Sequence, residues 1–220
     1  MNISRIIILN GPPQAGKDLL GTQIIESGLF TQAFPESFKK PLISIAAALI
    51  GMEESYLREN YESLKKRPVL GQLNLREVLI HISEIFIKPS FGSTHMGALA
   101  ATRIRKRASE ISARRPYLAN RSPLHLDGLT AVFTDSGFET EIEPLLNIVK
   151  THSDIHIIRI HRTGCDYSHC SRSYLDPEKM PSIADCSFYD LHNEETPTAL
   201  LHNFIETVFM PIRRKELSIA

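Results

Sequence analysis

Near its start the chain reads Ile6-Ile7-Ile8-Leu9-Asn10-Gly11-Pro12-Pro13-Gln14-Ala15-Gly16-Lys17-Asp18, and this segment is the strongest indication of its fold. The continuous apolar run before Gly11 is typical of a strand buried on both faces of a parallel sheet. The segment from Gly11 matches the pattern G-x-x-x-x-G-K, with Asp18 where Ser or Thr is usual. Apolar residues recur with helical spacing from Lys17 to Ser27. Strand, loop and helix therefore predict a phosphate-binding loop, and the alternative is a Gly-Pro turn that happens to contain a lysine.

Each part of this loop has a physical role. The backbone N–H groups of such a loop point inward to phosphate oxygens, and the following helix presents its positive N-terminal end to the same anion. Lys17 is expected to reach the β- and γ-phosphates of ATP. Asp18 is expected to hold Mg²⁺ through an oxygen or a water, because Mg²⁺ favours hard oxygen ligands. The expected cofactors are therefore ATP and Mg²⁺.

Strands and helices alternate along the rest of the chain. Further strands are predicted at 129–134, 155–160 and 188–192. Helices are predicted at 40–50, 75–86, 95–114, 139–150 and from Pro197 onward. Asn74 and Glu77 form the pattern of a capping box before the second of these helices, whose buried face would be Leu75, Val78, Leu79, Ile82 and Phe86. Residues 89–93 are expected to break that helix, and residues 53–71 read as charged and irregular.

This alternation favours an α/β fold: a three-layer P-loop NTPase architecture, with a parallel sheet, helices on both faces and a lid insertion. The 220 residues fit a single domain, 1–220. Residues 163–187 have no period, which predicts a long loop or lid around 162–187.

Composition limits the possible partners. The formal net charge is zero, so no strong overall field draws the protein onto nucleic acid or a membrane. The sequence has no run of 18 apolar residues, and no membrane partner is expected. Three cysteines without a secretion signal indicate reduced thiols and a cytoplasmic location. The sequence leaves the oligomeric state open.

A loop that ends in Gly-Lys-Asp resembles the loop of phage deoxynucleoside monophosphate kinases. The resemblance continues in Phe38-Lys39-Lys40-Pro41-Leu42, Leu75-Arg76-Glu77-Val78-Leu79, Val132-Phe133-Thr134-Asp135 and Tyr189-Asp190-Leu191-His192-Asn193. It implies an ATP-dependent phosphotransferase with a nucleotide-type acceptor, in the host cytoplasm if phage-encoded. It also implies that Arg76 lies near the acceptor and that Asp135 faces the phosphates.

One departure concerns the acceptor. That family places an arginine two residues after the strand-terminal Asp, whereas this chain has Asp135-Ser136-Gly137-Phe138. Together with Arg162-Thr163-Gly164-Cys165 and Cys170-Ser171-Arg172-Ser173, this segment resembles phage kinases that phosphorylate 5-hydroxymethyluracil within DNA. The resemblance implies modified DNA as the acceptor and Ser136 and Phe138 as substrate contacts. The alternative acceptor is a free deoxynucleoside monophosphate, which would make the protein a deoxynucleoside monophosphate kinase. The third possible function is a P-loop NTPase that is not a kinase.

The catalytic candidates are Lys17, Asp135, Arg162 and Arg172. Lid arginines would neutralise charge on the transferred phosphoryl group, and the alternative is two solvent-exposed arginines. Asp135 ends a strand at its carboxyl edge, where it could accept the acceptor's hydroxyl proton or hold Mg²⁺ through a water. The alternative for Asp135 is an Asx turn or a helix cap before Glu139.

A basic segment, 103–121, is the remaining candidate for contact with DNA. Its arginines and lysine could follow a phosphate backbone, while Tyr117 and Phe138 could stack on a flipped base. The alternative is a solvated helix face.

Overall fold

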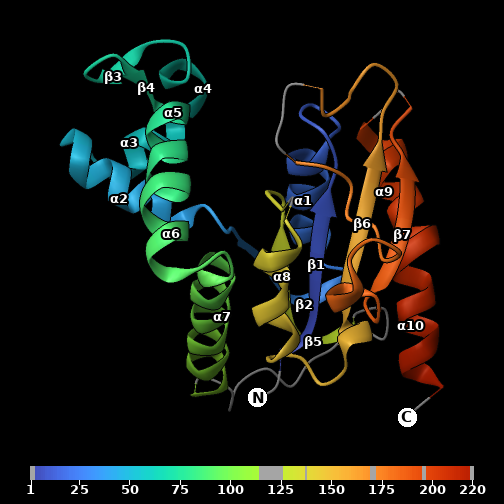
Figure 1. Cartoon of the computed structure of the whole chain (residues 1–220). Coiled ribbons are helices and arrows are strands. Elements are labelled where there is room, and N and C mark those ends of the chain that lie inside the picture. Colours follow the sequence, from blue (N-terminus) through green and yellow to red (C-terminus); the bar gives the residue numbers. More distant parts are fainter. Residues whose placement is uncertain (1–2, 114–125, 137, 169–171, 195–196, 219–220) are drawn as a thin grey trace.

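The computed structural model describes residues 3–113, 126–136, 138–168, 172–194 and 197–218. Its centre is a five-stranded sheet in which every neighbouring pair is parallel, in the order β2-β5-β1-β6-β7 (Figure 1). The strands are β1 (Ile3–Asn10), β2 (Phe30–Glu36), β5 (Leu126–Phe133), β6 (Ile155–His161) and β7 (Ser187–His192).

Helices cover both faces of this sheet, as predicted. The helices α1 (Lys17–Glu26), α9 (Pro197–Phe204) and α10 (Met210–Leu217) share one core cluster with the residues of β1 that face them, among them Ile7 and Leu9. The helices α7 (His95–Ala113) and α8 (Glu139–Leu146) pack on the opposite face over Ile6 and Ile8. The three-layer α/β fold is therefore confirmed.

The four predicted strands are confirmed with small shifts at their ends. Strand β2 was not predicted, because its residues Phe30-Thr31-Gln32-Ala33-Phe34-Pro35-Glu36 lack a continuous apolar run. This strand lies at the edge of the sheet, where a proline is tolerated because one side needs no ladder hydrogen bond. Among the helices, α8 ends at Leu146 rather than at Lys150.

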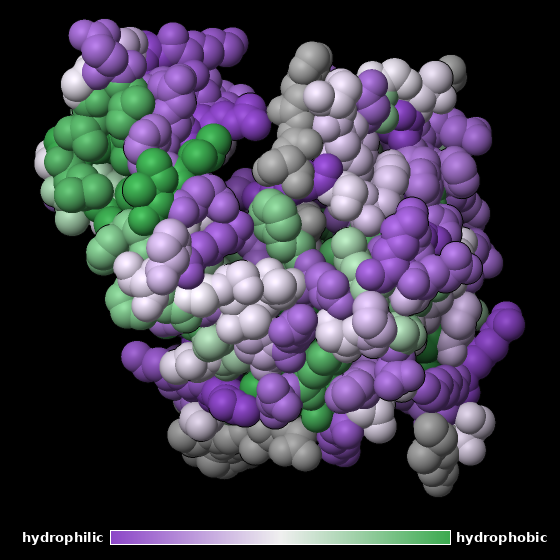
Figure 2. Space-filling model, viewed as in Figure 1, coloured by the Kyte–Doolittle hydropathy of each residue, from purple (hydrophilic) through white to green (hydrophobic). Residues whose placement is uncertain are grey.

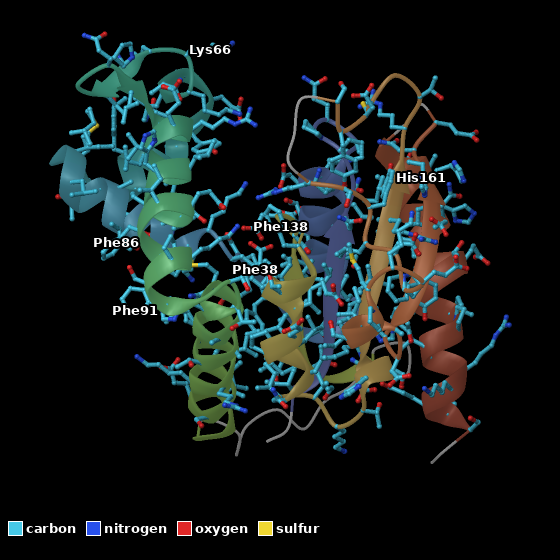
Figure 3. All side chains as sticks on the ribbon, viewed as in Figure 1. Phe38, Lys66, Phe86, Phe91, Phe138 and His161 are labelled. Atoms are coloured by element: carbon cyan, nitrogen blue, oxygen red, sulfur yellow. The ribbon has the colours of Figure 1, made fainter. Side chains whose placement is uncertain are left out.

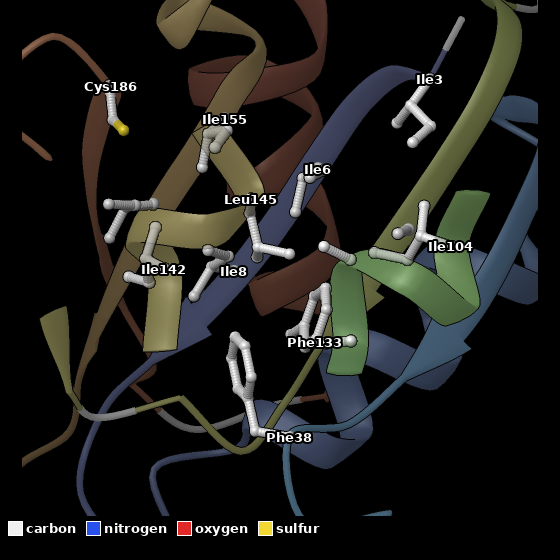
Figure 4. Close-up of a cluster of buried hydrophobic side chains, with 14 of the residues drawn as sticks. Ile3, Ile6, Ile8, Phe38, Ile104, Phe133, Ile142, Leu145, Ile155 and Cys186 are labelled. Atoms are coloured by element: carbon white, nitrogen blue, oxygen red, sulfur yellow. The ribbon is translucent and has the colours of Figure 1, made fainter. Parts of the chain in front are cut away.

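Phe38 and Phe133 stack with their ring centroids 4.5 Å apart in the core beneath α7 and α8. Figure 4 shows these rings beside Ile8 and the inward residues of α8, Ile142 and Leu145, all fully buried. Burying an aliphatic or aromatic side chain of this size stabilises a fold by about 1.5–3 kcal/mol. The carboxyl end of β5 and the start of α8 are therefore held rigidly.

A helical lobe, residues 40–96, stands beside the sheet and has its own apolar cluster (Figure 1). It contains α2 (Lys40–Ile50), α3 (Glu54–Glu59), α4 (Tyr61–Leu64), the hairpin of β3 (Pro68–Leu70) and β4 (Leu73–Asn74), α5 (Leu75–Ile80) and α6 (Lys88–Phe91). The prediction that 53–71 is irregular was therefore wrong. Two fully buried leucines, Leu57 and Leu64, anchor the short helices α3 and α4 within the lobe.

The capping box of Asn74 and Glu77 is confirmed, with both of its hydrogen bonds present. The predicted buried face fails at Phe86, which is 56% exposed, while Ile87 is buried. The cause is a π-helical segment, His81–Ile87, whose wider turn moves the inward position one residue along the chain. The predicted break at 89–93 is confirmed at Gly92, where the helix ends, whereas Pro89 is accommodated in the first turn of α6.

The segment predicted as a lid is partly built into the core. It carries one 3₁₀ turn, Pro181–Ile183, and both Leu175 and Ile183 are fully buried against the sheet. The side chain of Asn10 accepts a hydrogen bond of 2.9 Å from the backbone N–H of Leu175. Closure of the earlier part of the segment over the phosphate loop stays a prediction. Within the described residues, no helix is long and apolar enough to cross a membrane.

The contact between α7 and α8 generates a stability prediction. A Cβ atom at Gly97 would lie 2.2 Å from the backbone oxygen of Glu141, so Gly97→Ala forces the two helices apart. Although alanine favours a helix over glycine, we expect overpacking to lower the free energy of unfolding by about 1–3 kcal/mol. Chemical denaturation measures it, with exposed Lys106→Ala as the control in the same helix. An unchanged or raised stability would contradict the close contact.

Candidate active site

The phosphate loop joins β1 to α1 and depends on two glycines. Gly16 has φ of 103°, a left-handed conformation that suits glycine. A Cβ atom at Gly11 would lie 2.8 Å from the backbone oxygen of Ile160, so only glycine lets the loop approach β6 this closely. Gln14 also has a positive φ, 64°, unlike the other non-glycine residues in the described part of the chain. The predicted loop therefore has a defined, curved backbone.

Lys17 folds back over this loop. Its ammonium nitrogen donates to the carbonyl oxygens of Gly11 and Pro12, each at 2.6 Å. The side chain is half-buried, so its charge is held at the loop and not spread into solvent. This is the position from which an ammonium group can contact phosphate oxygens cradled by the loop.

Two side chains from the neighbouring strand ends brace the loop from outside. Arg162, directly after β6, donates to the carbonyl oxygen of Gln14 at 2.9 Å. Asn193, directly after β7, donates to the carbonyl oxygen of Ala15 at 2.9 Å. Arg162 was predicted as a lid arginine, and the structure brings it to the loop. Asn193 was missed, although it ends one of the segments on which the family resemblance rests.

Asp18 lies in the first turn of α1 with an exposed carboxylate. Mg²⁺ bound with a nucleotide usually takes one or two carboxylates together with phosphate oxygens and waters. Among the residues that the structure describes, no group of three or more His, Cys, Asp or Glu side chains could hold a metal ion. A glycine loop with one exposed carboxylate at its end fits ATP with Mg²⁺.

Asp135 follows β5 and is tied to the turn between β2 and α2. One carboxylate oxygen accepts from the hydroxyl of Ser37 at 2.7 Å and from the backbone N–H of Lys39 at 3.0 Å. The other oxygen accepts from the backbone N–H of Phe38 at 3.2 Å. Both oxygens therefore cap the turn that leads into α2. The alternative predicted a cap before Glu139, and α8 has no side-chain cap bond at its N-cap residue, Phe138. A catalytic role for Asp135 stays a prediction.

A second group of residues lines the crevice between the helical lobe and the sheet. The ring of Phe138, at the start of α8, lies 4.4 Å from the ammonium nitrogen of Lys88 in α6 and 5.9 Å from the guanidinium carbon of Arg172. Figure 3 shows Phe138 at this boundary, and Figure 2 shows the surface hollowed there. The predicted residues Phe138 and Arg172 are thus brought together, with Lys88 as a third member that the sequence analysis did not name.

Burial alters the pKa of two ionisable groups in the crevice. Burial, with a smaller effect from the Asp135 carboxylate, raises the pKa of Glu141 to about 7. Burial and the nearby charge of Arg172 lower the pKa of Lys39, while the carboxylates of Asp135, Glu141 and Asp18 oppose this change. Pairs of groups with altered pKa values in a cleft are typical of active sites. Neither Lys39 nor Glu141 was predicted as a site residue.

The two other predicted substrate contacts, Ser136 and Arg76, differ in their exposure to solvent. Ser136 is 1% exposed, and its hydroxyl oxygen has no hydrogen-bond partner. Arg76 is exposed on α5, and its charge and that of Arg172 both oppose the burial that raises the pKa of Tyr61. Arg76 of the lobe and Arg172, between β6 and β7, therefore both affect the pKa of Tyr61.

The described part of the basic segment makes contacts within the protein. Arg103 donates to Glu36 and to the carbonyl oxygen of Ser37, and Arg105 donates to the carbonyl oxygen of Asn147. The guanidinium carbon of Arg107 lies 4.4 Å from the ring centroid of Phe34. Arg103, Arg105 and Arg107 therefore contact other parts of the protein, unlike the solvated helix face of the alternative, and a contact of the segment with DNA stays a prediction. Residues 114–125, with Tyr117, and also Gly137, lie outside the described residues.

Two further cavities lie at the opposite, amino-terminal edge of the sheet. One, of about 200 Å³, is lined by residues that include Arg5, His156 and Lys215. The other lies beside Ile3 and Lys150. Neither has a lining residue in the phosphate loop or in the crevice. In an open α/β sheet, ligands bind at the carboxyl ends of the strands, which favours the loop and the crevice as the site.

Comparison with known proteins gives similarity at the level of structure alone. No protein-family model matches the sequence, and no curated protein matches it. A sugar kinase from Janibacter sp. HTCC2649 is 10% identical with a TM-score of 0.43, over 92% of this chain and 93% of that one. A gluconokinase from Sinorhizobium meliloti 1021 is 10% identical with a TM-score of 0.41, over 100% of this chain and 98% of that one. Similarity this low does not define an activity or an acceptor.

The hydrogen bonds of Asp135 generate a prediction that separates its two possible roles. Asp135→Asn replaces an acceptor oxygen by an NH₂ group that faces N–H or O–H donors. We expect the free energy of unfolding to fall by about 1–3 kcal/mol because buried donors lose their partner. Ser37→Ala removes one donor and leaves both carboxylate oxygens bonded, so it is expected to cost less. Equal stability of the wild type and Asp135→Asn in chemical denaturation would contradict the capping role.

Proposed function

We propose that this protein is a P-loop kinase, an ATP-dependent phosphotransferase of the transferase class. The observation that carries the proposal is the pairing of a lysine-covered phosphate loop with a separate charged crevice at the same edge of the sheet. A loop alone would suit any nucleotide-binding protein. A second site beside it provides a place for an acceptor, which a simple NTPase does not need.

The residues of the loop divide the work of binding the donor. The loop N–H groups and Lys17 bind the phosphates, and Asp18 is suited to Mg²⁺, which would neutralise charge on the β- and γ-phosphates. Arg162 is held at the loop by its hydrogen bond to the carbonyl oxygen of Gln14. Arg172 lies at the crevice beside Phe138. On this proposal, one arginine at the loop and one at the crevice would stabilise the charge that builds up during transfer.

We further propose that the acceptor is the hydroxymethyl group of 5-hydroxymethyl-deoxyuridine in phage DNA, a step of thymidine hypermodification. The support is the aromatic ring of Phe138, against which a flipped base could stack, and the segment Ser136-Gly137-Phe138, which replaces the position where an acceptor-binding arginine would be expected. The lysine and arginine on the same ring could pair with the phosphates that flank the flipped base.

One observation favours a second candidate, a deoxynucleoside monophosphate kinase that makes diphosphates for phage DNA synthesis. Lys88 and Arg172 are both within 6 Å of the Phe138 ring, and Arg76 acts on the same region. Such a group of cations could also bind the phosphate of a free nucleotide. A P-loop NTPase without an acceptor is the third candidate, and the crevice argues against it.

The loop geometry predicts the outcome of removing its lysine. We expect Lys17→Ala to lower phosphoryl transfer by about 10³-fold or more, because the charge on the β- and γ-phosphates is no longer neutralised. Lys66→Ala, at an exposed lysine of the helical lobe (Figure 3), is the matched control and should retain wild-type turnover. Both variants should unfold at the wild-type temperature. Near-normal turnover of Lys17→Ala would disprove the proposed role of the loop.

Labelled ATP and a panel of acceptors test the proposed substrate. The panel contains hydroxymethyluracil DNA, plain DNA of the same sequence and the free deoxynucleoside monophosphates. We expect label on hydroxymethyluracil DNA alone, with binding that weakens as salt rises, by a slope of about −0.9 per phosphate contacted on duplex DNA. Label on free monophosphates and none on the modified DNA would establish the monophosphate kinase alternative.

A further inference from the structure

Glu141 is an unusual carboxyl group for its position. It lies in the first turn of α8 and is 8% exposed, and one of its oxygens is buried without a hydrogen-bond partner among the described residues. The hydroxyl oxygen of Ser136, which precedes the same helix, is also buried and unpartnered. Most buried polar atoms in proteins have a partner, so two exceptions just before and within the first turn of one helix favour a site that receives a polar ligand.

The surroundings of Glu141 come from every side of the crevice. Four charged residues affect the pKa of Glu141. They are Asp135 after β5, Lys39 before α2, Lys88 in α6 and Arg172 between β6 and β7. Burial raises the pKa of Glu141 to about 7, and Asp135 adds to the rise, while the three cations oppose it. Near neutral pH the carboxyl group can therefore both release and take up a proton.

The position of Glu141 is fixed by its neighbours in the helix. Ile142 and Leu145 are fully buried in the core under α8 (Figure 4), and Gly97 of α7 packs against the backbone of Glu141 itself. Phe138 is the N-cap residue of the same helix, and its ring makes cation–π contacts with Lys88 and Arg172. A reactive group held on a rigid element is positioned more accurately than one on a loop.

We propose that Glu141 is the general base of the reaction and that it takes the proton from a hydroxyl group of the acceptor. This inference rests on the proposed phosphoryl transfer. As the acceptor oxygen forms a bond to the γ-phosphorus of ATP, the bond from that phosphorus to the bridging oxygen breaks and ADP leaves. The hydroxyl proton passes to the Glu141 carboxylate and from there to solvent. The products are a phosphate monoester, ADP and one proton.

The proposal also selects a class of acceptor. A phosphate group is already an anion near neutral pH and needs no base to become a nucleophile. A buried carboxylate beside it would repel it, since like charges in a site of low polarity disfavour each other. A hydroxyl group carries no charge and gains from a base with a pKa near the working pH. Glu141 therefore favours an uncharged hydroxyl acceptor over a nucleoside monophosphate.

Glu141→Gln tests the base. Glutamine has the shape of the protonated acid, so we expect the variant to fold and to bind ATP as the wild type does. We expect its transfer rate to a hydroxyl acceptor to fall by about 10²- to 10⁴-fold, the usual size of general-base catalysis. Glu143→Gln, two residues along the same helix, is the control and should transfer at the wild-type rate.

The pH dependence gives a readout that a structural role would not produce. A base must be deprotonated to act, so the wild-type rate should fall about tenfold per pH unit below a midpoint near 7 and level off above it. The Glu141→Gln variant should lose this acidic limb and show a low, flat rate. The wild-type profile tests the proposal even if the variant does not fold.

The outcomes separate this inference from the proposed function. If the wild type transfers label to a hydroxyl acceptor, while Glu141→Gln stays within threefold of it and keeps the acidic limb, the base assignment is overturned and the kinase stands. If hydroxymethyluracil DNA is not labelled but another hydroxyl acceptor is, with loss in Glu141→Gln, the proposed acceptor is wrong and the base stands. If only monophosphates are labelled, the base is overturned together with the proposed acceptor.

Discussion

The carboxylate of Asp135 connects the main sheet to the helical lobe. It projects from the end of a central strand and accepts three hydrogen bonds from the turn that leads into the helical lobe. That turn places Lys39 in the crevice and sets the direction in which α2 leaves the sheet. The contact of Lys88 with the ring of Phe138 and the packing of α7 on α8 connect the lobe to the same side of the sheet. The geometry of the proposed acceptor site therefore depends on a side chain that belongs to the sheet.

Electrostatics divides the carboxyl edge of the sheet into two regions. At the loop, Lys17 and Arg162 bind carbonyl oxygens and present positive charge to a single place. In the crevice, acidic and basic groups are mixed, and burial moves Lys39 and Glu141 toward their neutral forms. The first arrangement suits a highly charged ligand, and the second suits proton transfer. Such a division is what a transfer reaction between a charged donor and an uncharged hydroxyl requires.

Local patterns predicted the parts of the structure that local physics determines. The loop, four of the five strands of the main sheet, the helix 40–50 and the capping box at Asn74 all follow from short-range spacing. The outward turn of Phe86 could not be predicted, because a π-helical segment breaks the 3.6-residue period on which the expectation rested. Glu141 and Lys39 were missed for a different reason. Their altered pKa values arise from burial and from charges far away in sequence, and no short pattern encodes either.

The hydrogen bond from Asn193 to the carbonyl of Ala15 has a consequence for the loop's own peptide groups. A trans peptide is planar, so its C=O and N–H point in opposite directions. Fixing the Ala15 oxygen on the outer side of the loop turns the N–H of Gly16 toward the inner side. Glycine at this position could otherwise allow the peptide plane to rotate, since it has access to many backbone conformations. Asn193, directly after the last strand, thus fixes the orientation of the peptide group between Ala15 and Gly16 before an anion binds.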